Sequence, residues 1–229
     1  MIFATWLGQI DYDAAWDLQK EMVAARVEAA ELADELLLLE HPPTYTLGRS
    51  GKLDHLLLDE GSLAAQGFTV RWVDRGGDIT YHGPGQLVGY PILNLQRLFQ
   101  LQGFDKPDFH RYLRNLEEMI IMALAGFGIQ GWRYDGYTGV WVDRPDGPRK
   151  IAAIGVRVNA KGISSHGFAL NVNPDMSHFG HIVPCGISEH GVVSMAEILA
   201  RPLTPIDLLQ PITEAFAQVF ATELAVVNG

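Results

Sequence analysis

The chain has 229 residues, of which 48% are hydrophobic and 19% are charged. This length is sufficient for a domain with a sizeable core, and the composition is that of an ordered globular protein rather than a disordered chain. The formal net charge of −10 argues against a nucleic-acid partner, because binding to phosphates relies on clustered Lys and Arg. We therefore predict one domain over residues 1–229, with a small C-terminal extension from about residue 194 as the alternative.

The sequence also indicates where the protein resides. No apolar run reaches the roughly 18–20 residues that a membrane span needs, and the first residues carry Asp11, Asp13 and Asp17 instead of a basic signal-peptide region. Cys185 is the one cysteine of the chain, so no internal disulfide can form, which fits a reducing compartment. We expect a cytoplasmic protein without a membrane partner.

Apolar spacing and turn residues predict the following elements in chain order. They are a helix over 15–32, strands over 36–39, 68–73 and 87–95, a helix over 107–127, strands over 139–143, 150–158 and 163–172, and a helix over 205–224. The last three strands have the short connections of a β-meander. This order favours an α/β fold of the α+β type, in which a mixed β-sheet is backed by helices.

A glycine-rich loop lies between the second and third predicted strands. The segment Arg75–Gln86 contains four glycines together with Asp78, Thr80 and His82. Glycine lets backbone N–H groups approach a ligand without interference from Cβ atoms. The loop is therefore a candidate binding segment, and a long surface turn is the alternative.

Lys150 opens the predicted strand over 150–158. Because side chains alternate along a strand, we expect Lys150 to share the buried, apolar face with Ala152 and Ile154. A lysine at such a position would be partly desolvated, which would make the pKa of its amine easy to shift. The alternative is a lysine whose stem lies along apolar surface while its amine reaches water.

Cys185 lies between Pro184 and Gly186, in a turn that would let the thiol project toward a substrate. A lone cysteine is more commonly an inert, buried side chain. A nucleophilic thiolate needs a neighbouring cation, which Lys150 or His82 could supply if the fold brings them together. A zinc site would need His178, His181, Cys185 and His190, but these spacings match no established Cys/His pattern, so we predict no metal.

Charge is distributed unevenly along the chain. Residues 1–40 hold nine acids and two bases, a net charge of −7, whereas residues 133–161 hold six bases and three acids, a net charge of +3. An acidic partner could dock on the basic segment. Ordinary strand edges protected by Lys and Arg are an equal alternative.

Five segments, taken together and in order, resemble the lipoyl(octanoyl) transferase family. They are Glu40–Arg49, Arg75–Gln86, Arg149–Ala152, His166–Val172 and Pro184–Ile187. The resemblance implies a transferase with the biotin/lipoate protein ligase-like fold and no cofactor. It would move an octanoyl group from octanoyl-acyl carrier protein to a lysine on the lipoyl domains of 2-oxoacid dehydrogenase complexes and on the glycine cleavage H protein.

The resemblance also implies the site residues. Cys185 would carry the acyl thioester, and Lys150 would tune its chemistry. The implied substrate-binding residues are Arg75, Gly76, Gly77, Asp78, Ile79, Thr80, Tyr81, His82, Ala153, Ile154, Gly155, Gly167, Phe168 and Ala169. Two alternatives remain: an ATP-dependent lipoate-protein ligase, which needs no nucleophilic cysteine, and a non-catalytic protein that binds acyl carriers or lipoyl domains.

Overall fold

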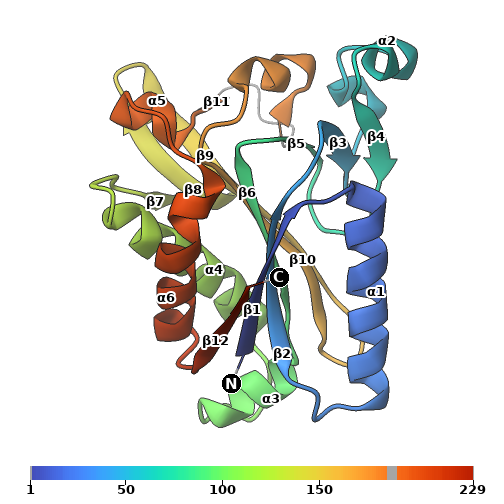
Figure 1. Cartoon of the computed structure of the whole chain (residues 1–229), viewed down its shortest axis with the longest axis vertical. Coiled ribbons are helices and arrows are strands. Elements are labelled where there is room, and N and C mark those ends of the chain that lie inside the picture. The colour runs from blue at the N-terminus through green and yellow to red at the C-terminus, as the bar shows by residue number, and fades with distance from the viewer. Residues whose placement is uncertain (1, 185–189, 229) are drawn as a thin grey trace.

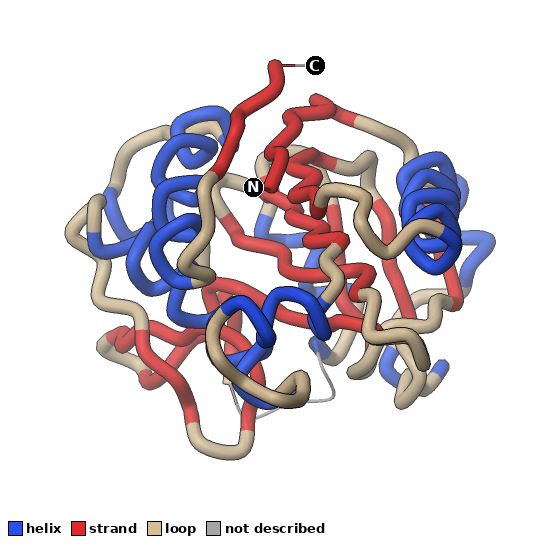
Figure 2. Tube along the Cα trace, turned by 90° about the horizontal axis from the view of Figure 1, so that it is seen from below, coloured by secondary structure: helices blue, strands red, loops and turns tan. Residues whose placement is uncertain are grey.

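A mixed β-sheet with helices on both faces forms the centre of the computed structural model, which describes residues 2–184 and 190–228 (Figure 1). Helix α1 covers one face of the sheet, and α4 and α6 cover the other, as the view from below also shows (Figure 2). A smaller sheet lies beside the large one. The predicted mixed sheet backed by helices is confirmed.

In the described residues the large sheet has nine strands, eight of which follow the order β12-β1-β2-β6-β10-β9-β8-β7, while β11 pairs with β9. Their bounds are β1 Ile2–Gln9, β2 Asp34–Glu40, β6 Gln86–Ile92, β7 Trp132–Tyr134, β8 Tyr137–Arg144, β9 Gly147–Val158, β10 Ser164–Asn171, β11 Gly191–Val192 and β12 Leu224–Asn228. Strands β8, β9 and β10 are antiparallel neighbours, which confirms the predicted meander.

The small sheet has the order β4-β3-β5, with β3 Thr44–Leu47, β4 Thr69–Trp72 and β5 Ile79–His82. The α-helices are α1 Tyr12–Glu28, α2 Glu60–Ala65, α3 Leu95–Leu101, α4 Phe109–Ala125, α5 Met195–Leu199 and α6 Leu209–Val219. Short 3-10 helices cover Leu53–His55, Met176–His181 and Pro205–Leu208.

The leucine run of β2 is buried on both faces of the sheet. Leu36 and Leu38 pack into the main core with α3, α4 and α6, whereas Leu37 and Leu39 pack toward α1. Since successive side chains of a strand point to opposite faces, an uninterrupted apolar run is typical of a strand covered on both sides. The run therefore determines that helices lie on both faces at this point.

Helix α4 begins at a capping residue and buries one apolar stripe. The side chain of Asp108 accepts a hydrogen bond from the backbone N–H of Arg111, which satisfies a donor that the first turn leaves free. The stripe packs against α6 and the sheet. None of the described helices combines the length and apolar character that crossing a bilayer requires.

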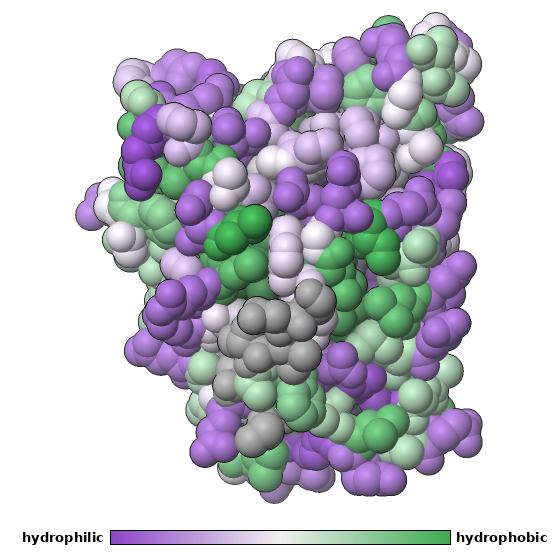
Figure 3. Space-filling model, in the orientation of Figure 1, coloured by the Kyte–Doolittle hydropathy of each residue, from purple (hydrophilic) through white to green (hydrophobic). Residues whose placement is uncertain are grey.

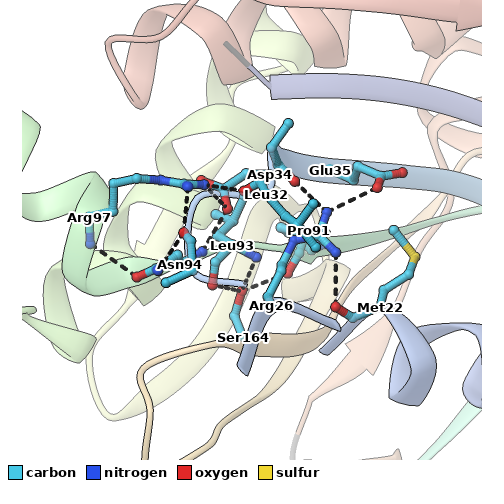
Figure 4. A network of polar contacts seen from close by, with 12 residues as sticks. Met22, Arg26, Leu32, Asp34, Glu35, Pro91, Leu93, Asn94, Arg97 and Ser164 are labelled. Atoms are coloured by element: carbon cyan, nitrogen blue, oxygen red, sulfur yellow. Dashed lines mark hydrogen bonds and ion pairs between the residues drawn. The ribbon is translucent and has the colours of Figure 1, made fainter. Parts of the chain in front are cut away.

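A polar network joins the C-terminal end of α1 to β2 and to the start of α3 (Figure 4). The buried Asp34 accepts a hydrogen bond from the backbone N–H of Asn94 at 2.8 Å and forms an ion pair with Arg97. Burial raises the pKa of Asp34, while these partners oppose that shift. Nearby, Arg26 donates to Met22 O and Glu35. The network fixes the C-terminal end of α1.

The described surface carries several exposed large apolar side chains, including Leu53, Leu57, Trp72 and Ile206. On the face seen in Figure 3, hydrophilic residues dominate the periphery and hydrophobic residues gather nearer the centre. Scattered apolar residues are ordinary on globular proteins, so these positions alone do not identify a binding surface.

Several sequence expectations differ from the structure. The last predicted helix ends at Val219, and Leu224 begins β12 instead, which pairs in parallel with β1. Strand β1 was not predicted, and part of the glycine-rich loop is strand β5. These strands are stabilised by distant partners, since β1 lies between β2 and β12, and β5 pairs with β3. Local apolar spacing does not reveal such pairings.

Candidate active site

A cavity of about 510 Å³ brings together the three predicted substrate-binding segments and Lys150. The predicted residues in its lining are Arg75, Gly76, Gly77, Asp78, Thr80, His82, Lys150, Ala153, Ile154, Gly155, Gly167, Phe168 and Ala169. The predicted nucleophile, Cys185, lies outside the described residues. The described part of the site therefore contains one of the two predicted catalytic residues.

Alternation along β5 separates the predicted residues of this segment into two groups. Thr80 and His82 line the cavity, whereas Ile79 and Tyr81 are fully buried in a separate core with residues of the small sheet. Because the strand period is two residues, one strand cannot direct all four side chains into one cavity. Ile79 and Tyr81 support the wall from behind.

Lys150 reaches the cavity because of a β-bulge. Ala152 lies opposite Val140 in β8, but Lys150 lies opposite Trp141, so Ile151 is an extra residue without a partner in the ladder. One extra residue moves the side chains that precede it to the opposite face of the sheet. The predicted shared face of Lys150 and Ala152 is therefore wrong: Ala152 lies in the main core, and Lys150 lines the cavity with 7% of its surface exposed.

The glycine-rich loop crosses β9 at Gly155. The backbone N–H of Gly76 donates to Val156 O at 3.0 Å, and a Cβ atom at Gly155 would lie 3.0 Å from Gly76 O and from the Arg75 side chain. Contacts this short leave no room for a larger residue without displacement of the loop. The close approach at Gly155 is between two parts of the same chain, whereas the expected approach of the loop glycines to a ligand stays a prediction.

Arg75 is buried and linked to the small sheet. Its Nη2 atom donates to Thr46 O at 2.7 Å and to Thr46 Oγ1 at 2.9 Å, and its Nη1 atom donates to Gly76 O. Thr46 Oγ1 lies 3.3 Å from His82 Nε2. Arg75 therefore fixes the loop backbone and places a cation in the cavity wall.

Asp78 connects the loop to a segment that sequence reasoning missed. Its carboxylate lies 2.5 Å from His55 Nδ1 and accepts a hydrogen bond from the backbone N–H of Lys52. Lys52, His55 and Ser50 all line the cavity. No spacing or motif distinguishes these three residues, because their link to the site is a contact between segments distant in the sequence.

His166 is a further cavity residue that was quoted within a motif but not assigned to the site. It has a left-handed backbone with φ of 54°, and its N–H donates to Gln19 Oε1 at 2.8 Å. Its Nε2 atom lies 2.7 Å from the carboxylate of Asp74, which also pairs with Arg157. A strained backbone held by several contacts is typical of functional positions.

The comparisons with known proteins identify the family. The model of the lipoyl protein ligase A/B catalytic domain matches residues 11–217. The chain belongs to this family. Curated relatives called octanoyltransferase include one from Chloroflexus aurantiacus, 47% identical over 95% of this chain and 93% of the relative, and one from Rubrobacter xylanophilus, 48% identical over 93% and 90%. The resemblance drawn from the five segments is confirmed.

Solved structures support the fold. The bi-partite lipoate protein ligase of Thermoplasma acidophilum covers 100% of this chain and 88% of its own with a TM-score of 0.77 at 15% identity. A lipoate-protein ligase A bound with ATP covers 100% and 90% with a TM-score of 0.69 at 13% identity. At these identities the likeness concerns the fold, and it confirms the predicted ligase-like fold.

In this family member, burial keeps neutral a group of rings that line the cavity or, in the case of His41, pack behind those that do. Burial raises the pKa of Tyr12 to about 12 and raises that of Tyr90 as well. Burial lowers the pKa of His41 to about 4, and it also lowers the pKa of His82 and of His166. His41 Nε2 lies 2.7 Å from Tyr90 Oη.

These histidines predict a loss of stability in acid. In the unfolded chain His41 has its ordinary pKa of 6.5, whereas in the folded state its pKa is about 4, so below pH 6.5 the unfolded state takes up the proton first. The stability that neutral His41 contributes is therefore fully present above pH 6.5 and is lost as the pH falls toward 4. From His41 alone, the free energy of unfolding should decrease by about 2 kcal/mol between about pH 7 and about pH 5. His82 and His166 act in the same direction.

Urea unfolding at the two pH values measures this effect. His41→Gln should reduce the loss of unfolding free energy on acidification, and the control His110→Gln, at an exposed position of α4, should not change it. An unfolding free energy in the wild type that does not change between the two pH values would contradict the prediction.

The histidines of the 3-10 helix at 176–181 have partners in the small sheet. His178 Nδ1 lies 2.8 Å from Tyr81 Oη, and His181 Nδ1 lies 2.9 Å from Tyr45 Oη. Within residues 2–184 and 190–228, no three His, Cys, Asp or Glu side chains are placed to hold a metal ion together. The zinc alternative gains no support from these positions.

Proposed function

We propose that the chain transfers an octanoyl group from octanoyl-acyl carrier protein to the target lysine of lipoyl domains, through a thioester on Cys185. The observation that carries the proposal is the cavity in which Lys150 and the three family-like segments meet. Relatives called octanoyltransferase at 46–48% identity support the octanoyl group as the cargo. The cavity volume of about 510 Å³ lies within the range of about 300–1,000 Å³ that small-molecule sites occupy.

In the first half-reaction, the Cys185 thiolate attacks the carbonyl carbon of the donor thioester. The bond from that carbon to the carrier sulfur breaks, and the carrier leaves as a thiolate that takes up the proton that the Cys185 thiol gave up. Exchange between two thioesters is nearly isoenergetic, so ATP is not needed. A cation such as the Lys150 ammonium would stabilise the attacking thiolate.

In the second half-reaction, the amine of the acceptor lysine attacks the same carbonyl carbon. The bond to Cys185 breaks, an amide forms, and the proton of the amine passes to a base, for which Lys150 in its neutral form is our candidate. Backbone N–H groups of the glycine-rich loop and of Ala153–Gly155 would stabilise the negative charge that develops on the carbonyl oxygen.

A single incubation tests the proposal against its alternatives. Octanoyl-acyl carrier protein without ATP should leave an octanoyl adduct on the protein, detectable by mass spectrometry of the intact chain. An ATP-dependent ligase would form an acylated product only when ATP and free acid are supplied, and a binding protein would form no adduct. An adduct that appears only with ATP would overturn the proposal.

The carrier and the acceptor domains are part of the same proposal. By family resemblance both are acidic, and so is this chain as a whole, with a net charge of −10. Long-range repulsion would slow their encounter unless a local basic surface faces the partner. The proposed location, the cytoplasm, would supply both partners.

The turn between β8 and β9 is our candidate for that basic surface. Arg149 is held by an ion pair with Asp146 and donates to Val192 O, and Arg133 and Arg157 are also ion-paired. These contacts reduce the free positive charge of residues 133–161. Arg144, at the end of β8 in this turn, remains the position to test.

We expect Arg144→Glu to raise the KM for the carrier more than it lowers kcat. A rim charge acts mainly on encounter, and the effect should shrink as salt shortens electrostatic reach to about 8–10 Å. Steady-state kinetics at low and high salt measure it, with Lys161→Glu, outside this turn, as the matched charge reversal. An unchanged carrier KM at low salt would exclude this turn from the docking surface.

A further inference from the structure

Glu117 is a fully buried carboxylate in α4 that does not line the cavity. Its Oε2 atom accepts hydrogen bonds from Arg114 at 2.6 Å and from Arg133 at 3.1 Å. Its Oε1 atom accepts a hydrogen bond from the backbone N–H of Gly139 in β8, at 3.0 Å. Burial of a charge is costly unless partners compensate it, and here part of the compensation comes from the backbone of a neighbouring strand.

Gly139 lies close to the stem of Lys150. Its φ of 122° falls in the region that favours glycine, and a Cβ atom there would lie 2.5 Å from Ala152 O. The same Cβ atom would lie 3.4 Å from Lys150 Cε and 3.6 Å from Lys150 Cδ. A side chain at position 139 would therefore begin in contact with the lysine stem, and the glycine leaves this space to Lys150.

Trp141 completes this surface two residues further along β8, on the same face of the strand. Lys150 lies opposite Trp141 in the ladder, and its Nζ atom lies 5.0 Å from the centroid of the indole ring. An ammonium within about 6 Å of an indole face is attracted to it, most strongly where water is excluded. Trp141 is almost fully buried.

The β-bulge gives the surroundings of Lys150 a role in placing its side chain. Ile151 interrupts the β8–β9 ladder immediately beside Lys150, so regular strand pairing does not by itself determine where the side chain points. The direction of the Lys150 side chain is restricted further by the packing of its stem beside Gly139 and by the position of its amine near the Trp141 ring. Glu117 holds the strand that provides both contacts.

We propose that Trp141, together with Glu117 acting through Gly139, positions the Lys150 amine in the cavity. This inference rests on the proposed function for the role of Lys150 in acyl transfer. The three are positioning residues, because none of them is argued to touch the reacting atoms. Their removal should lower kcat while the KM for the acyl carrier changes little.

The test of the link through α4 compares neighbouring carboxylates. Glu117→Gln weakens the acceptor of the Gly139 N–H, whereas Glu118→Gln weakens a partner of Arg133 at a partly exposed position and leaves that acceptor unchanged. We expect Glu117→Gln to lower kcat about tenfold, which is part of the roughly hundredfold or more that a positioned acid–base group contributes, with KM within about twofold. Glu118→Gln should keep both constants within about twofold.

The indole contact is tested by conservative replacement. Trp141→Phe retains an aromatic face for the ammonium, whereas Trp141→Leu retains only apolar bulk. We expect kcat to be highest in the wild type, lower in Trp141→Phe and lowest in Trp141→Leu, again with little change in KM. If Glu117→Gln fails to fold, this pair decides the proposal: equal kcat values for Phe and Leu would overturn it.

A second readout does not depend on octanoyl transfer. The rate at which an amine-specific acylating reagent modifies Lys150, followed by mass spectrometry of its peptide at one pH, reports how the amine is held. We expect labelling to be several-fold faster in Trp141→Leu and Glu117→Gln than in the wild type and in Glu118→Gln, because an amine that is no longer held beside the buried ring is more accessible to the reagent. Equal labelling in all proteins would overturn the inference.

A wild type without acyltransferase activity would overturn the proposed function instead, while the labelling rates would still test the positioning.

Discussion

Cys185→Ser is expected to fold normally and to lose the octanoyl adduct. Serine is close in size to cysteine, but its hydroxyl is a far weaker nucleophile without a strong base beside it. We expect the overall transfer rate to fall by at least about a hundredfold, since the covalent route depends on the thiolate. The measurements are intact-chain mass spectrometry after incubation with octanoyl-acyl carrier protein and the rate of octanoylation of a lipoyl domain.

The sequence makes this experiment unusually clean. Cys185 is the one cysteine of the chain, so a thioester on the wild type can form at no other residue. Cys185→Ala serves as the second variant, because it removes even a slow oxygen nucleophile. A Cys185→Ser protein that turns over at nearly the wild-type rate would exclude the covalent mechanism.

Lys150→Arg is expected to lower the transfer rate by at least about tenfold, because a positioned acid–base group typically contributes about a hundredfold or more. Arginine keeps the positive charge but is a larger, planar cation that does not release its proton in proteins. The site leaves little freedom for an arginine side chain, because the lysine stem passes close to Gly139 and the amine lies 5.0 Å from the centroid of the Trp141 ring.

Single-turnover kinetics separate the two roles proposed for this lysine. If Lys150 only stabilises the thiolate by its charge, Lys150→Arg should form the adduct at close to the normal rate. If it also takes the proton of the attacking amine, transfer from the adduct to the lipoyl domain should be the slower step in the variant. Lys161→Arg, at an exposed position, is the control for the substitution itself. An unimpaired Lys150→Arg enzyme would limit the lysine to an electrostatic role that arginine can replace.

Long apolar patterns in the sequence predicted most of the central sheet. The leucine run at 36–39, the strands at 150–158 and 163–172 and the apolar stripe over 107–127 all correspond to elements of the structure. Each of these elements buries a continuous stripe or face, which leaves a strong periodic signal. Strands β1 and β12 were missed because each depends on pairing with distant segments, and β12 begins at Leu224, the last residue of the predicted helix.

Details of the site depended on geometry that a sequence does not display. A strict two-residue alternation placed Lys150 on the core face, but the extra residue at Ile151 turned it into the cavity. Alternation did separate Thr80 and His82 from Ile79 and Tyr81, once β5 was known to be a strand within the glycine-rich loop. The same rule therefore succeeded or failed according to whether the ladder was regular.

The sequence by itself determined the family, through five short segments in a fixed order, and with it the candidate cavity residues and the candidate nucleophile. Such segments are local: a glycine that permits close approach or a cysteine between proline and glycine can be recognised from its neighbours alone. Only the tertiary structure decided that Lys52, His55 and His166 join the cavity and that Glu117, 33 residues before Lys150, is linked to it through Gly139. These relations are contacts between distant segments, and the free energy that maintains them comes from burial and pairing in the folded chain, which local sequence patterns do not encode.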